Sequence, residues 1–181
     1  MSYVNLSYNY IAVFFLFMLL YWYIMEKKVP LRSYRYFAYV LVTAFGATVL
    51  EIMTYRFAAM ENTISFRVTY TIMSIQMLFI HSFFTCLTNY LLGLAEVDIK
   101  RNHKLKAVFV ISWFLIVLIC GLNPVFEWAA TLVGSVYAMK GIGFLLYGID
   151  AVMVFMMAWV LITKREKFRF IKKSIAIFLF L

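Results

Sequence analysis

Charge is scarce in this sequence: only 14% of its 181 residues are Asp, Glu, Lys or Arg, while 66% are hydrophobic. A soluble domain contains roughly a quarter charged residues and roughly half apolar ones. This composition therefore excludes an ordinary water-soluble fold. It predicts an integral membrane protein whose main partner is the lipid bilayer.

Cysteine, proline and catalytic motifs are also scarce. The two cysteines, Cys86 and Cys120, both lie in apolar runs, so neither a disulfide framework nor a cysteine-based metal site is expected. The two prolines, Pro30 and Pro124, are both expected in loops, so the broken helices typical of transporters are not indicated. No HExxH, Walker or glycine-rich phosphate motif occurs. We therefore expect no metal, no cofactor and no catalysis in these residues.

Long apolar runs are what the sequence has in abundance. A helix must cross about 30 Å of hydrocarbon at about 1.5 Å per residue, and five runs come close to or exceed that length. The fold class predicted is an all-α polytopic membrane protein, with residues 1–181 forming a single transmembrane domain. The predicted spans are Tyr8–Met25, Tyr36–Ala58, Val68–Leu94, Ala107–Leu122 and Ile142–Ile162.

The basic residues alternate between the two sides of these runs. The segments after the five runs contain 4, 2, 4, 1 and 6 Lys and Arg residues, where the second count includes Arg56 at the end of its run. The positive-inside rule assigns the richer side, with 14 of the 17 basic residues, to the cytoplasm. The N-terminus is then outside, and the chain is expected in the inner or plasma membrane. Because the net charge of +9 lies beside membrane spans, no nucleic-acid partner is expected.

The sequence ends KREKFRFIKKSIAIFLFL, a basic run followed by the start of a sixth apolar run at Ser174. Eight helical residues reach only about 12 Å. A helix that stopped there would leave its last carbonyl groups without partners in lipid. We therefore predict that the sixth span is truncated and that these 181 residues form the front part of a longer protein. A short C-terminal hairpin or an interfacial helix is the alternative.

The segment between the fourth and fifth runs has two interpretations. Gly134-Ser135 separates the β-favouring stretches Val125–Trp128 and Val136–Met139, which is typical of a hairpin on the outer surface. The aromatic residues could equally anchor an interfacial segment at headgroup level.

Ionisable residues inside the spans are the candidate functional residues. Glu51 and Asp150 lie at similar predicted depth, and His81 lies near the middle of the third span within a polar stripe that includes Ser74. One interpretation is that these residues bond neighbouring helices, at about 0.6 kcal/mol each. The other is an outward-facing polar site formed by Glu51, Ser74, His81 and Asp150. That site would bind a small molecule at the outer face or sense protons.

The sequence does not favour a peptidase site. His81 and Cys86 are similar to the His/Cys pair of membrane peptidases that process quorum-sensing propeptides. Residues five apart on a helix are rotated by about 140°, so these two side chains should face different ways. The glycine-rich approach to the histidine is also missing.

Four stretches carry a resemblance to a known group: LRSYRYFAYVLVTAFGATVLEI, NPVFEW, YAMKGIGFLLYGID and KREKFRFIKK. With the outside N-terminus, they make the chain similar to the N-terminal multi-span input regions of bacterial signalling proteins, especially GGDEF-type diguanylate cyclases. Some sensor histidine kinases share the layout. The resemblance implies two further spans, a cytoplasmic output domain and a homodimer formed through that domain. The GGDEF motif itself is absent, so this fragment is expected to sense and anchor rather than catalyse.

The alternative function is membrane transport. A small transporter or exporter subunit would use Glu51, His81 and Asp150 as a coupling path through the membrane. Its expected signature, an inverted repeat or a pair of broken helices, is not visible in the sequence.

Overall fold

The computed structural model describes residues 6–25, 32–60, 66–97, 102–133, 136–166 and 168. Its main elements are five α-helices with a two-stranded hairpin between the fourth and the fifth. In chain order they are α1 (Ser7–Met25), α2 (Arg32–Ala59), α3 (Phe66–Leu94), α4 (His103–Phe126), β1 (Ala130–Val133), β2 (Val136–Met139), the short 3₁₀ helix η1 (Gly141–Gly143) and α5 (Phe144–Thr163).

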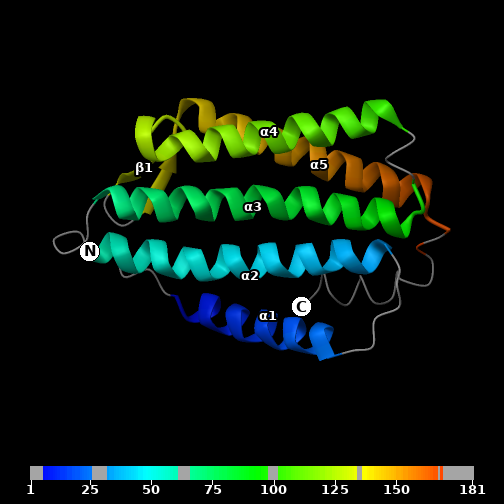
Figure 1. Cartoon of the computed structure of the whole chain (residues 1–181), viewed down its shortest axis with the longest axis horizontal. Coiled ribbons are helices and arrows are strands. Elements are labelled where there is room, and N and C mark those ends of the chain that lie inside the picture. The colour runs from blue at the N-terminus through cyan, green and yellow to red at the C-terminus, as the bar shows by residue number, and fades with distance from the viewer. Residues whose placement is uncertain are drawn as a thin grey trace.

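The five helices lie alongside one another, and each runs antiparallel to the one before it (Figure 1). Helix α3 is central, because it packs against α2 on one side and against α4 and α5 on the other, while α1 packs against α2. The hairpin lies at the end of the bundle where α1, α3 and α5 begin, here called the hairpin end. The other end is called the opposite end.

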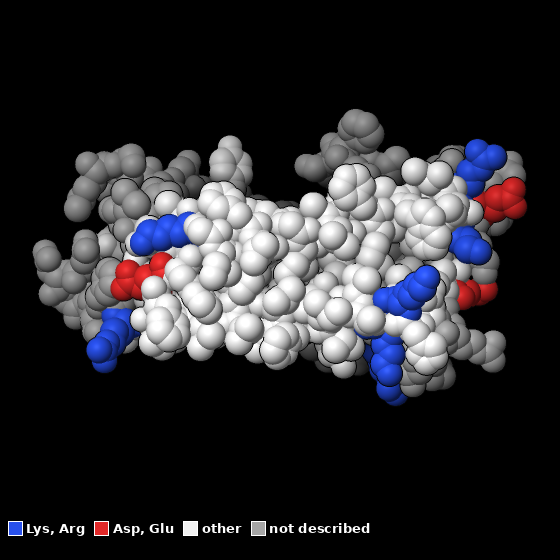
Figure 2. Space-filling model, turned by 90° about the horizontal axis from the view of Figure 1, so that it is seen from above, with Lys and Arg blue, Asp and Glu red and all other residues white. Residues whose placement is uncertain are grey.

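All five helices are long and apolar enough to cross a membrane, which supports the membrane class and the helical fold predicted from the sequence. Figure 2 shows Lys, Arg, Asp and Glu toward the two ends of one face, with an uncharged belt between them. Large apolar side chains are also exposed along the helices: Phe114 on α4 is 64% exposed and Phe155 on α5 is 75% exposed. A surface of this kind suits lipid chains and is rare in water.

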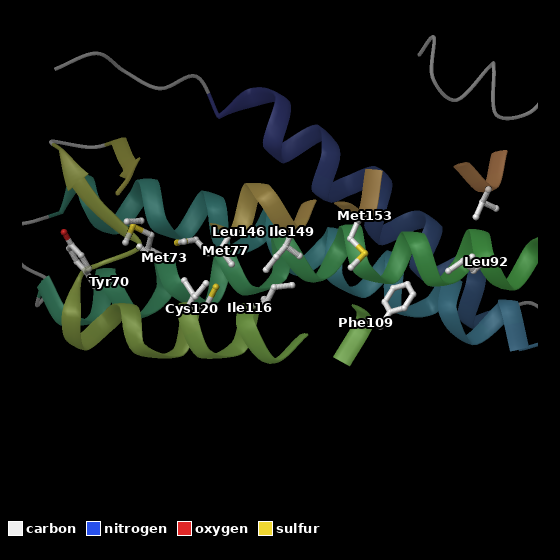
Figure 3. Packing of buried hydrophobic residues seen from close by; sticks show 14 of the residues in the cluster. Tyr70, Met73, Met77, Leu92, Phe109, Ile116, Cys120, Leu146, Ile149 and Met153 are labelled. Atoms are coloured by element: carbon white, nitrogen blue, oxygen red, sulfur yellow. The ribbon is translucent and has the colours of Figure 1, made fainter. Parts of the chain in front are cut away.

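The best-packed part of the core lies between α3, α4, α5 and the hairpin. Figure 3 shows Met77, Ile116, Cys120 and Leu146 gathered between the helices that carry them. These side chains are at most 2% exposed. Helix α1 lies outside this core, and Tyr23 is its one buried residue among those described.

Helix α4 departs from the sequence prediction at both ends. It begins at His103 because the Asn102 side chain accepts a hydrogen bond from the Leu105 N–H, which caps the first turn. It continues to Phe126, so the prediction that Pro124 lies in a loop is wrong. Two helical residues, Val125 and Phe126, follow Pro124, and the helix then ends where Glu127 adopts a left-handed conformation with φ of 52°.

The segment forms a hairpin, as the first of its two interpretations predicted, but the position of its first strand differs. Strand β2 is the predicted Val136–Met139, and it pairs antiparallel with β1 in a register that places Val133 opposite Val136. The predicted first strand, Val125–Trp128, is wrong because α4 takes up its first two residues. The strand instead begins at Ala130. The predicted sixth span, from Ser174, lies outside the described residues.

Two glycines on either side of the start of α5 give a matched test of this packing. An added Cβ at buried Gly143 would overlap the Ala129 carbonyl group, whereas an added Cβ at Gly148 meets nothing within 4 Å. We expect Gly143→Ala to lower the free energy of unfolding by about 1–3 kcal/mol through overpacking against rigid backbone. Gly148→Ala should be neutral or slightly stabilising, since alanine favours helix over glycine. Unfolding by sodium dodecyl sulfate in mixed micelles measures both, and equal stability of the two variants would contradict the packing.

Candidate functional site

His81 of α3 and Asp150 of α5 form a buried pair inside the bundle. The distance from His81 Nδ1 to Asp150 Oδ2 is 2.8 Å. His81 is 2% exposed and Asp150 is 8% exposed. The two residues are 69 positions apart in the chain, so packing of α5 against α3 brings them together.

The pair is enclosed mostly by apolar side chains. Met77 and Leu146 lie about one turn away toward the hairpin end, and Met153 lies about one turn away toward the opposite end. All three are at most 2% exposed. A site with such walls has a low effective dielectric, so an uncompensated charge there is costly.

The hydrogen bonding of Asp150 is incomplete. Its Oδ2 meets His81, but its Oδ1 is buried and makes no hydrogen bond to any described residue. A fully ionised carboxylate can accept about four hydrogen bonds. An ionised Asp150 would therefore be poorly compensated, and protonation of the pair would reduce this deficit.

Ser74 belongs to a different polar cluster, which fixes the hairpin to the bundle. The buried Asn123 donates from Nδ2 to Ser74 Oγ over 3.0 Å. Its Oδ1 accepts hydrogen bonds from the backbone N–H groups of Ala129 at 2.9 Å and Ala130 at 3.0 Å. One amide thus joins α3, α4 and the start of β1.

Sequence reasoning missed Asn123, because it was assigned to a loop. The available signal was an amide side chain at the end of an apolar run, directly before a proline. The cluster has a second tie to the hairpin, since the Tyr70 hydroxyl and the Thr131 hydroxyl are 2.7 Å apart. These contacts suit a structural role at the hairpin end.

Glu51 occupies a third place. It is partly buried on α2, close to the side chain of Asn9 on α1 and to Tyr55 on its own helix. Helix α2 separates α1 from α3 (Figure 1), so Glu51 lies on the α1 side, away from the His81–Asp150 pair. The four residues that the sequence grouped in one outward-facing site are therefore distributed over three places.

The threonines of the α3 stripe bond mainly to backbone. The Thr85 hydroxyl donates to the His81 carbonyl oxygen at 3.3 Å, and the Thr88 hydroxyl donates to the Phe84 carbonyl oxygen at 2.8 Å. Thr88 also lies 3.5 Å from the Met153 carbonyl oxygen of α5. The first two bonds lie within α3, and the Thr88–Met153 contact is the one that reaches another helix.

Among the described residues, no three His, Cys, Asp or Glu side chains come together as a metal site would require. No protein-family model matches the chain, and no curated protein or solved structure is significantly similar to it. The functional inference therefore depends on the bundle and its buried polar groups.

Proposed function

We propose that this chain is the membrane-embedded input and anchoring domain of a bacterial signal-transduction protein, of the diguanylate-cyclase type that the sequence resembles. In this proposal the hairpin end faces outward and the basic loops face the cytoplasm of the inner or plasma membrane. Residues 1–181 carry no catalysis, and an output domain beyond them forms the homodimer. The observation that best supports the proposal is the buried His81–Asp150 pair between α3 and α5.

Helix α5 is attached to the bundle along one face. Its buried residues recur at helical spacing, and the remaining surface is exposed; the buried set is Leu146, Ile149, Asp150, Met153 and Val160. It packs mainly against α3 and only lightly against α4. The position of α5 should therefore depend strongly on its few polar contacts with α3, of which the His81–Asp150 contact is the shortest.

This attachment suits the transmission of a signal. Helix α5 is followed by the basic run that begins at Lys164, on the side that the charge pattern assigns to the cytoplasm. A stimulus that binds unequally to two packings of α5 against α3 would shift their populations. A small molecule at the hairpin end could act in this way through the Asn123 cluster.

The His81–Asp150 pair is also compatible with the transporter alternative, because paired ionisable groups at membrane depth are typical of proton relays. However, Glu51 lies apart from His81 and Asp150, so the three-residue coupling path expected from the sequence is not the arrangement observed. A proton path would have to use the pair alone.

A reporter fusion tests the proposal. Residues 1–181 are joined to a diguanylate cyclase output domain in cells that lack other such enzymes, and cyclic di-GMP is measured. Asp150→Asn should change output by about fivefold or more, which corresponds to a coupling free energy of about 1 kcal/mol. Glu51→Gln is the matched control, because it neutralises an intramembrane acid outside the α3–α5 contact, and it should leave output near wild type.

Two results would count against the input domain. The first is output that is insensitive to Asp150→Asn and His81→Gln while the fusion is present in the membrane. The second is proton flux into liposomes that depends on Asp150, which would favour the transporter.

A further inference from the structure

We propose that the His81–Asp150 pair is a proton-binding site in the interior of the membrane domain. The pair holds one proton at neutral pH, so that it is electrically neutral, and the gain or loss of a proton loosens α5 from α3. The ligand is the proton itself, and the responsive element is α5.

The argument begins with the charge of each protonation state. With one proton shared, the pair is either imidazolium with carboxylate or imidazole with carboxylic acid, and its net charge is zero. Removing that proton leaves a net charge of −1, and adding a second proton leaves +1. Either charge would lie in an apolar interior, where an uncompensated ion is strongly disfavoured.

The groups around the pair offer no other compensating charge. Cys120 is the titratable group that approaches Asp150 from α4, and the Tyr147 ring of α5 meets the His81 ring edge-on at a centroid distance of 6.1 Å. On α2, Glu51 lies close to Asn9 and Tyr55 instead. Within the described ranges, His81 is the basic partner of Asp150.

The unpaired oxygen of Asp150 strengthens the preference for the neutral state. Asp150 Oδ1 is buried without a hydrogen-bond donor among the described residues. In the pair with a net charge of −1, the Asp150 carboxylate would therefore be poorly stabilised. A neutral imidazole could still donate from Nδ1 to Oδ2, but the full negative charge would remain on Asp150.

The apolar layers around the pair link protonation to helix movement. Buried Met77 and Leu146 lie about one helical turn from the pair toward the hairpin end, and buried Met153 lies about one turn away toward the opposite end. Movement of α5 away from α3 would expose a charged pair further to water and to polar groups. The free energy of an uncompensated charge therefore favours the separated packing.

The proton site does not depend on the proposed signalling function, whereas its effect on an output domain rests on that function. Failure of the reporter fusion would leave the proton site standing. Failure of the measurements below would remove the proton site and leave the fusion result to decide the function.

Nitrogen-15 NMR of the imidazole rings tests the proton directly. The chain contains two histidines, and His103 is exposed at the start of α4, so it provides an internal reference. In lipid nanodiscs at about pH 7.5, the ring of the exposed His103 gives a reference signal from a histidine outside the pair. His81 should show either both nitrogens protonated or an unprotonated Nδ1 that accepts from the Asp150 carboxyl group. A neutral His81 ring with its proton on Nδ1 would overturn the proposal.

Variants assign that signal to the pair. Asp150→Asn removes the carboxyl group, so a doubly protonated His81 ring should become neutral, while Glu51→Gln should leave the His81 signal unchanged. A His81 ring with both nitrogens protonated in Asp150→Asn as well as in wild type would also overturn the proposal. Should Asp150→Asn fail to fold, the wild-type spectrum alone still decides.

Movement of α5 is followed by the distance between two spin labels, attached to Tyr39→Cys of α2 and Thr163→Cys of α5. Both positions are exposed in the half of the bundle toward the opposite end, and Cys86 and Cys120 are replaced by alanine. The distance distribution should shift or broaden at about pH 5 and about pH 9 relative to neutral pH. It should not change with pH in the His81→Leu/Asp150→Leu double variant. An unchanged wild-type distribution at all three pH values would contradict the coupling of protonation to α5.

Discussion

Asp150→Ala is expected to lower the free energy of unfolding by about 3 kcal/mol. Interhelical hydrogen bonds in membranes average about 0.6 kcal/mol, because the unfolded state in lipid also finds partners. Removing one member of a buried ion pair costs about 3–5 kcal/mol in soluble proteins, since the other charge is left without compensation. The 2.8 Å contact and the burial of both residues make the pair comparable to a buried ion pair, so we expect a loss at the lower end of the range of about 3–5 kcal/mol. Unfolding by sodium dodecyl sulfate in mixed micelles measures the loss.

A double-mutant cycle measures the interaction free energy between His81 and Asp150 apart from the contacts that each makes with other residues. His81→Leu/Asp150→Leu removes both polar groups and fills the space with apolar atoms, so its stability should lie within about 1 kcal/mol of wild type. The single variants His81→Leu and Asp150→Leu should each be markedly less stable than the double variant. Glu51→Gln serves as the control for a change of intramembrane acid elsewhere. Strict additivity of the two single variants would show that His81 and Asp150 do not interact.

Asn123→Leu is expected to have the second large effect. The variant leaves two buried backbone N–H groups, those of Ala129 and Ala130, and the Ser74 hydroxyl without their partner. Each buried group left unsatisfied costs about 1–3 kcal/mol, so the total loss should be about 3 kcal/mol or more. The N–H groups of Ala129 and Ala130 should also lose most of their protection from hydrogen exchange.

The matched control for this prediction is Asn102→Ala. Asn102 also bonds a backbone N–H, that of Leu105, but it is an exposed helix cap, so its loss should cost only about 1 kcal/mol. Exchange at Ala129 and Ala130 should be unchanged in this variant. If Asn123→Leu left hairpin exchange at the wild-type rate, the Asn123 cluster would not be what fixes the hairpin.

The helical fold could be predicted from the sequence because hydropathy acts residue by residue. An apolar run long enough to cross lipid must satisfy its backbone groups internally, and a helix does so without help from the rest of the chain. The ends of α4 and the first strand were harder. Pro124 and Val125 favour a loop or a strand locally, yet the side chain of Asn123 bonds the backbone that follows and the helix continues past them.

The candidate site was predictable only in part. The cost of ionisable groups in lipid singled out Glu51, His81 and Asp150, but the sequence does not determine how each helix is rotated about its axis. The rotation of α3 and α5 pairs His81 with Asp150, and the rotation of α2 turns Glu51 toward Asn9. Ser74 belongs to the polar stripe that the sequence singles out, whereas its partner Asn123 lies just beyond the predicted fourth span.

The five-span arrangement is tested most directly by labelling two engineered cysteines with a membrane-impermeant thiol reagent, in a variant with Cys86 and Cys120 replaced by alanine. Lys104→Cys lies at the start of α4 and Lys140→Cys follows the hairpin, and both positions are exposed. Helix α4 places them at opposite ends of the bundle, and the charge pattern places Lys140 outside. Intact cells should therefore label Lys140→Cys, whereas Lys104→Cys should be labelled only after the membrane is permeabilised. Labelling of both cysteines in intact cells would contradict the crossing of the membrane by α4, and the reverse pattern would contradict the orientation.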